Sequence, residues 1–510
     1  MLALGAGGLG TLALAGCTSP PGPDAVAGPW DCGVASGLHE PGVAVLWTRF
    51  APAASSTVEL AWEVAEDPGF ARVVASGTAD AGPGTDGCAK VLAGGLAPGR
   101  HHWYRFRVDG ATSPTGRTWT PPAQDSSPDA VRLAVASCQD FSAGWYPAWR
   151  AVAESDVHAV VHLGDYIYES KGSVNPLWDV RDDPSAAAVD LGTYRAKYRL
   201  YRTDADLRAA HAAHPFAPVW DDHEFVNNCH RGTIAGQPAR AAAAYRAWFE
   251  YQPVWPIAGT RIHRRLRFGR LADLSLLDTR QYRDPNPERE QLVATDAPPG
   301  SVAHDPDRTL MGPAQRDWLL DGLGSAQADG VTWKVLGQQV MLAPLRWIDL
   351  DQPPLGAGGG PEGVYLNLDQ WDGYGAERDR LCAFLHDEGI ANTAVLTGDI
   401  HSFWQASIHR DVHDHTSPAV AQEFVCGSIS STALGFAPEL AEAFSAFTKG
   451  FSPAFRHVDW QRRGYGHLEA TPDAMAVEFR IVDPAVRSSV AQRAVRFDWA
   501  EGTDVVAVSR

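Results

Sequence analysis

Apolar runs that stop abruptly at polar residues recur along this chain after about residue 130. One run covers Val131 to Ala136 and ends at Ser137-Cys138-Gln139, and another covers Val157 to Leu163 and ends at Gly164-Asp165. The stretch between them, Pro147 to Asp156, has apolar residues at helical spacing. This pattern predicts a strand, a helix and a second strand, which form a βαβ unit of a parallel sheet. Ligands of such sheets collect beyond the carboxyl ends of the strands, so these polar residues are the first candidates for a functional site.

Three later apolar runs also end in ionisable clusters. They are residues 216–220 before Asp221-Asp222-His223-Glu224, residues 274–277 before Asp278-Thr279-Arg280, and residues 393–397 before Gly398-Asp399-Ile400-His401. We expect these strand ends to meet at one edge of the fold. Further expected elements are a strand over 331–336, helical segments over 193–213 and 239–251, and C-terminal strands over 476–482 and 494–499.

The pattern between about residues 30 and 120 is different. Residues 43–50, 58–64 and 102–108 alternate between apolar and polar positions, and Gly and Pro recur at short intervals between them. Alternation of this kind predicts half-buried antiparallel strands. Leu96-Ala97-Pro98-Gly99 resembles the turn of fibronectin type III domains. We therefore expect an all-β, fibronectin- or immunoglobulin-like sandwich over residues 30–120, a Pro-rich linker over 121–129, and a catalytic domain over 130–510.

The first 17 residues resemble a lipoprotein signal. They form an apolar stretch rich in Gly and Ala that is too short to span a bilayer, and the stretch ends at Leu14-Ala15-Gly16-Cys17. Cys17 would accept the lipid, which makes an anchor at this residue the expected contact with a membrane. A signal peptide normally opens with basic residues, yet Arg49 is the first in this chain. We therefore expect a true start further upstream and export, by a twin-arginine route if that region carries the motif; the alternative is a simple apolar tail.

Composition limits the kind of partner. The 510 residues are 45% hydrophobic and include 18 Trp, which suffices for a large core and at least two domains. The formal net charge of −18 argues against nucleic acid as a partner, because phosphate backbones need basic surface. Of the seven cysteines, Cys32 and Cys88 share the N-terminal region and could pair, whereas the pairing of Cys229, Cys382 and Cys426 stays open.

Taken singly, each candidate ligand is weak evidence, because a free cysteine is usually a buried structural residue. Together the spacings follow the plan of calcineurin-like metallophosphoesterases with three departures. Cys138 stands in place of an aspartate, Asp222 of an asparagine and Asp399 of a histidine, and Gln339 lies near the place of a further histidine. The motifs that contain these departures resemble the alkaline phosphatase D (PhoD) family, and they are Ala136-Ser137-Cys138-Gln139 and the segments 162–169, 220–228, 278–283 and 396–401.

The resemblance covers nearly the whole chain. It implies an α/β fold with a four-layer αββα metallophosphoesterase core, preceded by the all-β sandwich. It also implies a secreted, calcium-dependent phosphatase or phosphodiesterase with iron at its centre. The expected substrate is a phosphate ester, and no oligomeric state follows.

The residue types agree with two different metals. A thiolate, a phenolate, a carboxylate and an imidazole together suit Fe³⁺, whereas an all-oxygen neighbour suits Ca²⁺. Iron is assigned to Cys138, Asp165, Tyr168 and His401, with Asp165 as the bridge. Calcium is assigned to Asp165 and Asp399, with either Asp222 or Asn227 as the further ligand.

Two more residues are candidates for catalysis. His223 stands where metallophosphoesterases keep a protonating or phosphate-orienting histidine, and the alternative is a structural hydrogen bond to Asp221. Arg280 could bind phosphate, or it could pair with Asp278 or another acid. We expect an exported metal-dependent phosphatase acting on monoesters, diesters or both by means of an activated water. The alternatives are a phosphodiesterase or phospholipase D that cleaves lipids or teichoic-acid-like polymers, and a non-catalytic phosphate-binding lipoprotein.

Overall fold

The computed structural model describes residues 28–171, 179–287, 295–297, 302–349, 363–432 and 438–510, so the expected signal over residues 1–17 lies outside the described part. Its largest sheet has ten strands, and β9, β10, β11 and β1 at its centre are parallel. In spatial order the strands are β25 (Val506–Ser509), β24 (Gln492–Ala500), β23 (Ala474–Val482), β22 (Arg463–Ala470), β9 (Val131–Ala136), β10 (Ala159–His162), β11 (Pro215–Pro218), β1 (Val34–Leu38), β2 (Ala44–Arg49) and β5 (Cys88–Ala93).

A second sheet has seven strands, of which β13, β15, β18 and β20 are parallel. In spatial order they are β12 (Arg264–Phe268), β13 (Ala272–Leu276), β15 (Trp333–Gln338), β18 (Thr393–Thr397), β20 (Ala419–Cys426), β19 (Phe403–His409) and β21 (Phe455–Asp459). A small sheet combines β14 (Thr295–Ala297), β17 (Gly363–Tyr365) and β16 (Arg346–Asp349).

Eight α-helices pack on these sheets within the described residues. They are α1 (Pro147–Ala153), α2 (Leu191–Tyr201), α3 (Ala205–Ala213), α4 (Arg231–Gly236), α5 (Pro238–Tyr251), α6 (Pro313–Ala328), α7 (Gly375–Asp387) and α8 (Pro438–Phe451). The single helical segment expected over residues 193–213 is divided into α2 and α3. The carboxylate of Asp204 accepts hydrogen bonds from the backbone N–H groups of Asp206 and Leu207, so it caps a new helix at this point.

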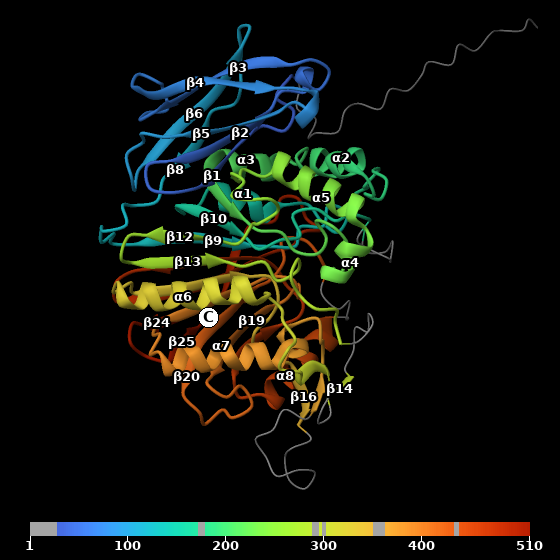
Figure 1. Ribbon diagram of the computed structural model, residues 1–510, viewed down its shortest axis with the longest axis vertical. Helices are drawn as coiled ribbons and strands as arrows, with labels where there is room; N and C mark the ends of the chain where they lie inside the picture. Colours follow the sequence, from blue (N-terminus) through green and yellow to red (C-terminus); the bar gives the residue numbers. More distant parts are fainter. Residues whose placement is uncertain (1–27, 172–178, 288–294, 298–301, 350–362, 433–437) are drawn as a thin grey trace, which may run out of the picture.

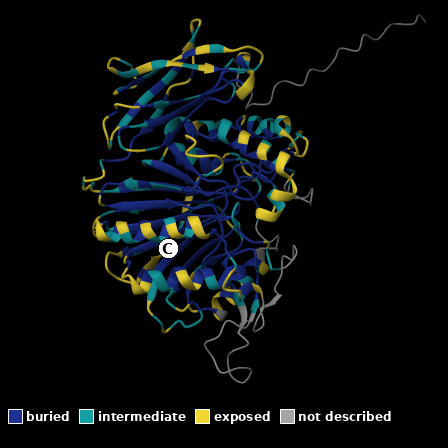
Figure 2. Cartoon of the chain, viewed as in Figure 1, coloured by how far each residue is buried: buried dark blue, intermediate teal, exposed yellow. Residues whose placement is uncertain are grey.

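The seven-stranded sheet lies between two hydrophobic cores. Val335 on β15 belongs to the core shared with the ten-stranded sheet, whereas its neighbour Leu336 belongs to the core beneath α6 and α7. Leu396 and Val395 on β18 divide in the same way. Successive side chains of a strand point to opposite faces, so both faces of this sheet are covered. The two sheets therefore face each other with helices outside them (Figure 1), and the exposed residues of α6 and α7 lie on their outward faces (Figure 2).

The N-terminal β-sandwich shares one of its two layers with the rest of the molecule. Its outer layer is formed by β4 (Val73–Ala81), β3 (Val58–Ala65), β6 (His101–Val108), β7 (Ala111–Thr112) and β8 (Gly116–Trp119). The facing layer is β1, β2 and β5, which extend the ten-stranded sheet through the parallel pairing of β1 with β11. Leu46 on β2 packs into the sandwich core, and the adjacent Trp47 packs into the core of the larger part. The all-β region is thus joined to the catalytic part by a continuous sheet.

Most expected strands are confirmed with shifts of one to two residues at their ends, including β3, β9, β13 and β18. The same holds for β23 and β24 near the C-terminus and for helix α5. In the part of the chain that the structure describes, no helix combines the length and apolar character that crossing a membrane requires.

Candidate metal and catalytic centre

The candidate ligands lie where the chain leaves the parallel strands in an uncommon backbone conformation. Cys138 follows β9, Asp165 follows β10, and Asp399 and His401 follow β18. All four have φ between 55° and 59°, and only nine non-glycine residues of the described part have positive φ. Such residues are strained, and the surrounding fold must hold them in place. Their concentration at strand ends therefore marks this edge as the functional one.

Cys138, Asp165 and His401 form a compact group of donors. The sulfur, a carboxylate oxygen and a ring nitrogen all lie within 4.8 Å of one another. Tyr168 completes the group, because its Oη is 2.9 Å from Asp165 Oδ2 and 3.0 Å from His401 Nε2. Ligand atoms at right angles on metal bonds of about 2.1 Å are separated by about 3.0 Å. The spacing therefore fits four ligands around one ion.

The protonation of this group also fits a cation. Burial raises the pKa of the Cys138 thiol and of the Tyr168 phenol, and the charge of Asp165 raises both further. A positive ion among them would favour the anionic forms that coordinate metals. His401 Nδ1 lies 2.9 Å from the carbonyl oxygen of Thr432, so this nitrogen carries the proton and Nε2 is free to bind.

A second group of carboxylates lies beside the first. Asp165, Asp222 and His223 are close enough to share an ion, and so are Asp221, Asp222 and Asp399. Asp222 Oδ1 and Asp221 Oδ2 are buried and have no hydrogen-bond partner. Buried carboxylate oxygens without a partner are costly, and they are the donors that hard cations such as Ca²⁺ prefer. Asp165 and Asp222 each belong to two groups, so they connect neighbouring candidate ion positions.

Arg280 donates hydrogen bonds to three carboxylates, and a fourth, Asp222, lies 3.6 Å from its Nη2. It is 1% exposed, and it donates to Asp221 through Nε, to Asp369 Oδ2 through Nη1 at 2.8 Å and to Asp399 Oδ1 through Nη2 at 2.5 Å. Burial lowers and the surrounding carboxylates raise the pKa of Arg280, with the net effect upward. Although burial raises the pKa of Asp222, the nearby Arg280 lowers it below its usual value. Two roles were expected for Arg280, phosphate binding and pairing with acids, and the contacts observed in the structure are those with acids.

His223 forms a dyad with Glu169. Its Nδ1 is 2.7 Å from Glu169 Oε2, its ring stacks on Tyr168 at a centroid distance of 4.2 Å, and its side chain is 17% exposed. Burial alone would lower the pKa of His223, but Asp222, Asp165 and Glu169 raise it above the usual value. The partner is therefore Glu169 and not Asp221. The orientation leaves Nε2 as the nitrogen that can give up a proton to a bound group.

Glu224 fixes the two loops that carry these ligands. Its Oε2 accepts hydrogen bonds from the backbone N–H groups of Asp165 (3.0 Å) and Asp221 (2.9 Å), and its Oε1 accepts one from Tyr166 (2.7 Å). Burial and the charge of Asp165 raise the pKa of Glu224 to about 8. One buried side chain thus sets the distance between the loop after β10 and the loop after β11.

Comparison with known proteins agrees with this arrangement. A family profile described as "PhoD-like phosphatase" matches residues 133–479, and one described as "PhoD-like phosphatase, N-terminal domain" matches residues 16–122. Alkaline phosphatase D of Bacillus subtilis (strain 168) is 35% identical over 474 residues, which is 89% of this chain and 78% of that protein. The chain belongs to the PhoD-like phosphatase family. A solved structure titled "Structure of PhoD" superposes with a TM-score of 0.85 at 31% identity, covering 95% of this chain and 93% of that one.

Membership in the PhoD-like phosphatase family makes this chain a phosphoric ester hydrolase, with a phosphate ester as its substrate. The phosphatase family was expected from the sequence, and it is confirmed. The three donor groups lie inside the region that the phosphatase profile matches, so the candidate centre belongs to the catalytic part of the chain.

Within this PhoD-like chain, not every residue expected at the centre lies there. Asp222 belongs to the carboxylate group, whereas Asn227 is exposed and contributes a backbone N–H group to Glu169 at 3.4 Å. The geometry therefore favours Asp222 over Asn227 as a ligand. Gln339 does not face the ligands. Its side-chain oxygen accepts a hydrogen bond from Thr279, and its side-chain nitrogen donates to the carbonyl oxygens of Trp220 and Leu277.

Several residues of the centre were given no ligand or catalytic role from the sequence. They are Asp221, Glu169, Glu224, Asp369, Gln370 and Ser431. Asp221, Glu169 and Glu224 belong to motifs that were recognised, so their position in those motifs was the available signal. Asp369 and Gln370 come from a segment without a strand-end pattern, and Ser431 lies in the segment after β20, a strand that was not expected from the sequence.

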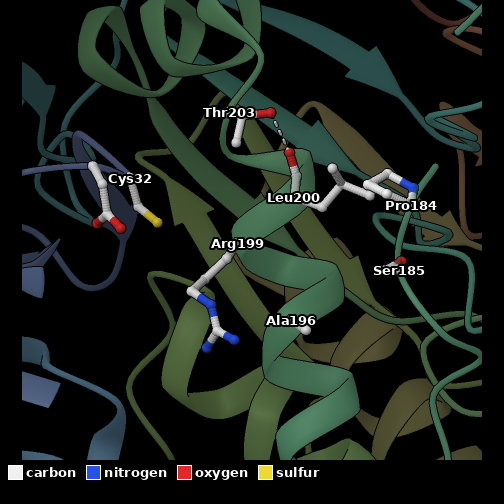
Figure 3. A pocket seen from close by; sticks show the side chains of 8 residues that line it. Cys32, Pro184, Ser185, Ala196, Arg199, Leu200 and Thr203 are labelled. Carbon is white, nitrogen blue, oxygen red and sulfur yellow. Dashed lines mark hydrogen bonds between the residues drawn. The ribbon is translucent and has the colours of Figure 1, made fainter. Parts of the chain in front are cut away.

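The cysteines differ from expectation. All six described cysteines are buried free thiols, so Cys32 and Cys88 are not paired. Cys32 lies just before β1 and Cys88 begins β5, and β2 runs between these strands. Two strand spacings of about 4.8 Å exceed the Cα separation of a disulfide. Cys32 instead lines a pocket beside α2 together with Arg199 and Thr203, apart from the candidate ligands (Figure 3).

Proposed function

We propose that this phosphatase uses Fe³⁺ and Ca²⁺ to hydrolyse phosphate monoesters, diesters or both. The observation that carries the proposal is the donor group of Cys138, Asp165, Tyr168 and His401, which combines a thiol, a carboxyl, a phenol and an imidazole around one point. Strongly basic anions such as phenolate and thiolate suit a trivalent iron, and the adjoining group of carboxylates suits calcium. The two facing sheets with outer helices support a metallophosphoesterase core.

The residues of the chain then have separate roles. Cys138, Tyr168 and His401 would hold iron, Asp165 would bridge, and Asp222 and Asp399 would hold calcium. Bound metals of this type neutralise the ester, acidify a water and stabilise the leaving oxygen. His223 faces the same space with a raised pKa and a proton on Nδ1 directed to Glu169, so its Nε2 can protonate a leaving alcohol. Arg280 fixes the positions of the carboxylates through its hydrogen bonds.

Two assays and one analysis test this proposal. The purified enzyme should hydrolyse 4-nitrophenyl phosphate or bis(4-nitrophenyl) phosphate, and mass spectrometry should find iron and calcium in it. A calcium chelator should stop turnover while iron stays bound, because oxygen ligands exchange calcium readily and a thiolate–phenolate site does not release iron. Full turnover after exhaustive removal of calcium would refute the calcium assignment.

The same comparison decides between ester classes. Preference for the diester would support a phosphodiesterase or a lipid- or polymer-cleaving enzyme at an unchanged centre, and preference for the monoester would support a phosphomonoesterase. Asp399→Ala should abolish both activities without unfolding the protein, because it empties one ligand position and leaves the core packed. Normal turnover of this variant would contradict the role of Asp399.

Export and lipidation are proposed from the sequence alone. Leu14-Ala15-Gly16-Cys17 follows an apolar stretch, which supports a lipoprotein attached through Cys17. Radiolabelled palmitate should enter the full-length protein in cells and should be absent from Cys17→Ser. Equal labelling of both proteins would exclude Cys17 as the attachment site.

A further inference from the structure

A groove of about 660 Å³ runs beside β12, outside the candidate metal centre. Its walls come from the turn that follows β1 (His39 to Pro41), the loop from Val254 to Ile257, strand β12 and helix α6. No candidate metal ligand or catalytic residue lines it. Cavities of this size are typical of small-molecule sites.

Arg264 supplies to this groove a guanidinium that has no ion-pair partner among the described residues. Its Nη1 donates to the carbonyl oxygen of Ile262 at 3.2 Å and its Nη2 to that of Pro218 at 3.0 Å. No carboxylate of the described residues lies within ion-pair distance of Arg264, although the chain carries a net charge of −18. Burial lowers the pKa of Arg264 to about 10, and no acidic group raises it. The guanidinium stays charged at neutral pH and keeps donors in excess of the two that are used.

The neighbouring arginines of β12 are neutralised and do not share this property. Arg265 lies 3.1 Å from Asp273, and Arg267 lies 3.4 Å from the same carboxylate and 3.5 Å from Asp329. A partly buried guanidinium without a counter-ion can bind an anion without first breaking an ion pair. Arg264 is therefore the arginine of this strand that is available for a bound anion.

Another part of the groove lining is apolar. Trp255 is 38% exposed and Ile257 is 53% exposed, and both line the groove. Large exposed hydrophobic side chains gathered in a hollow favour a ligand with apolar surface. Arginines on an edge strand also discourage strand addition, but that role requires a side chain directed into water. Arg264 is only partly exposed, and it is tied to two carbonyl groups of neighbouring segments.

The position of the groove agrees with a binding site. Arg264 pairs with Leu276 in the β12–β13 register, two residues before Asp278, and His39 follows the carboxyl end of β1. Since β13, β15 and β18 are parallel, Arg264 lies at the same edge of the seven-stranded sheet as Asp399 and His401. Parallel sheets bind ligands along this edge.

We propose that this groove binds a small organic anion, with the oxyanion on Arg264 and an apolar ring or chain against Trp255 and Ile257. The anion is a carboxylate or a phosphoryl monoester, because both groups offer two oxygens that can accept hydrogen bonds from the guanidinium. The site is separate from the catalytic centre, so it can be filled while substrate is bound.

Calorimetric titration of the metal-loaded enzyme tests the proposal with benzoate, phenylphosphonate, acetate and benzyl alcohol. Benzoate or phenylphosphonate should bind at a site that persists in Asp399→Ala. Arg264→Met should weaken that binding about tenfold or more, because a charge-assisted hydrogen bond is lost. Acetate and benzyl alcohol should bind more weakly, because each lacks one half of the ligand. Binding of benzoate alone identifies a carboxylate, and binding of phenylphosphonate alone identifies a phosphoryl ligand.

Matched variants keep the test decisive. Arg316→Met, on a half-buried arginine of α6 whose ion pair within the described residues is with the adjacent Asp317, should leave binding unchanged. Trp255→Ala should reduce the affinity for benzoate while leaving the affinity for acetate as it was. Hydrolysis of 4-nitrophenyl phosphate by Arg264→Met should keep the wild-type kcat. Absence of binding by either aromatic anion, or equal affinity in the wild type, Arg264→Met and Trp255→Ala, would overturn the proposal.

Discussion

Single side chains set the chemistry of this centre because they are buried among like charges. Asp221, Asp222 and Asp399 surround one guanidinium, and the thiol of Cys138 and the phenol of Tyr168 face Asp165. Burial raises the pKa of Asp221 and of Asp399, and neighbouring carboxylates raise it further, in opposition to Arg280. Such a cluster ionises fully only when cations are present. Each candidate ligand would therefore favour the binding of a cation by this cluster.

Colour is the most direct test at this scale. If Tyr168 and Cys138 bind Fe³⁺, visible light can move electrons from phenolate and thiolate to the metal, so the pure protein should be coloured. Tyr168→Phe should shift or bleach the phenolate part of the absorption and Cys138→Ser the thiolate part, and both should lower turnover. Absorption spectra with metal analysis provide the measurement. A colourless and fully active protein that contains two zinc ions would refute the iron assignment, because Zn²⁺ has a filled d shell.

Glu224 allows a test of loop positioning. In Glu224→Gln, one carboxylate oxygen becomes an NH₂ group that faces backbone N–H donors, so one to two of three hydrogen bonds are lost. We expect a loss of about 1–3 kcal/mol in the free energy of unfolding, together with a lower metal content. Thermal unfolding and metal analysis measure both effects. Glu388→Gln, at the exposed glutamate that directly follows α7, is the control and should match the wild type.

At the scale of elements, the pairing of β1 with β11 joins the N-terminal sandwich to the strands that carry the ligands. β11 leads directly into Asp221 and Asp222, and its other neighbour is β10, which leads into Asp165. Without β1, an edge of β11 and the side chains beneath β2 would be exposed to water. The sandwich therefore supports the catalytic loops even though it supplies no candidate ligand.

Truncation tests this support. A chain that begins at residue 28 should keep full turnover, because every candidate ligand and catalytic residue lies at or after Cys138. A chain that begins at residue 123 should lack a cooperative unfolding transition or be insoluble, because it loses β1, β2 and β5 from the ten-stranded sheet. Circular dichroism and ester hydrolysis compare the two. Normal turnover of the shorter chain would show that the shared sheet is dispensable.

At the scale of the whole molecule, a group of histidines lies where the sandwich meets the catalytic part. His158 stacks on Trp119 with a centroid distance of 4.7 Å, and His101 is 6.2 Å from His158. His214 Nδ1 lies 3.3 Å from Arg117. Burial and the charge of Arg132 lower the pKa of His158 to about 4. Burial and the charge of Arg117 lower the pKa of His214 to about 4 as well. Asp156 is the nearby carboxylate that acts in the opposite direction on His158.

These shifts predict that the molecule loses stability in acid. The pKa of an unfolded histidine is about 6.5, so between about pH 6.5 and pH 4 the unfolded chain binds more protons than the folded one. The stabilisation is complete above pH 6.5 and falls as the pH decreases through this window, by about 1–3 kcal/mol for each histidine. Melting temperatures between pH 7 and pH 4 measure the loss. The decline should be shallower in His158→Gln/His214→Gln than in the wild type.

An exposed histidine provides the control for this series. His386→Gln, whose side chain is 44% exposed in the wild type, should follow the wild-type curve. If the double variant and the wild type declined in parallel, other buried groups would account for the acid sensitivity.

The sequence by itself determined the family, the parallel strands and most of the residues that the fold brings together at the candidate centre. This was possible because residues such as Cys138, Asp165 and Asp399 directly follow apolar runs, and a strand end fixes where the next side chain lies. Tertiary structure decided the rest. Asp222 and Asn227 are equivalent in a motif, and only the fold buries one and exposes the other. The partners of Arg280 and His223 are up to 119 residues away in sequence. The pairing of β1 with β11 joins the N-terminal region to the catalytic region, which the sequence pattern predicted as two separate domains. Contacts between distant segments leave no local pattern, because they depend on how the two sheets and their loops pack.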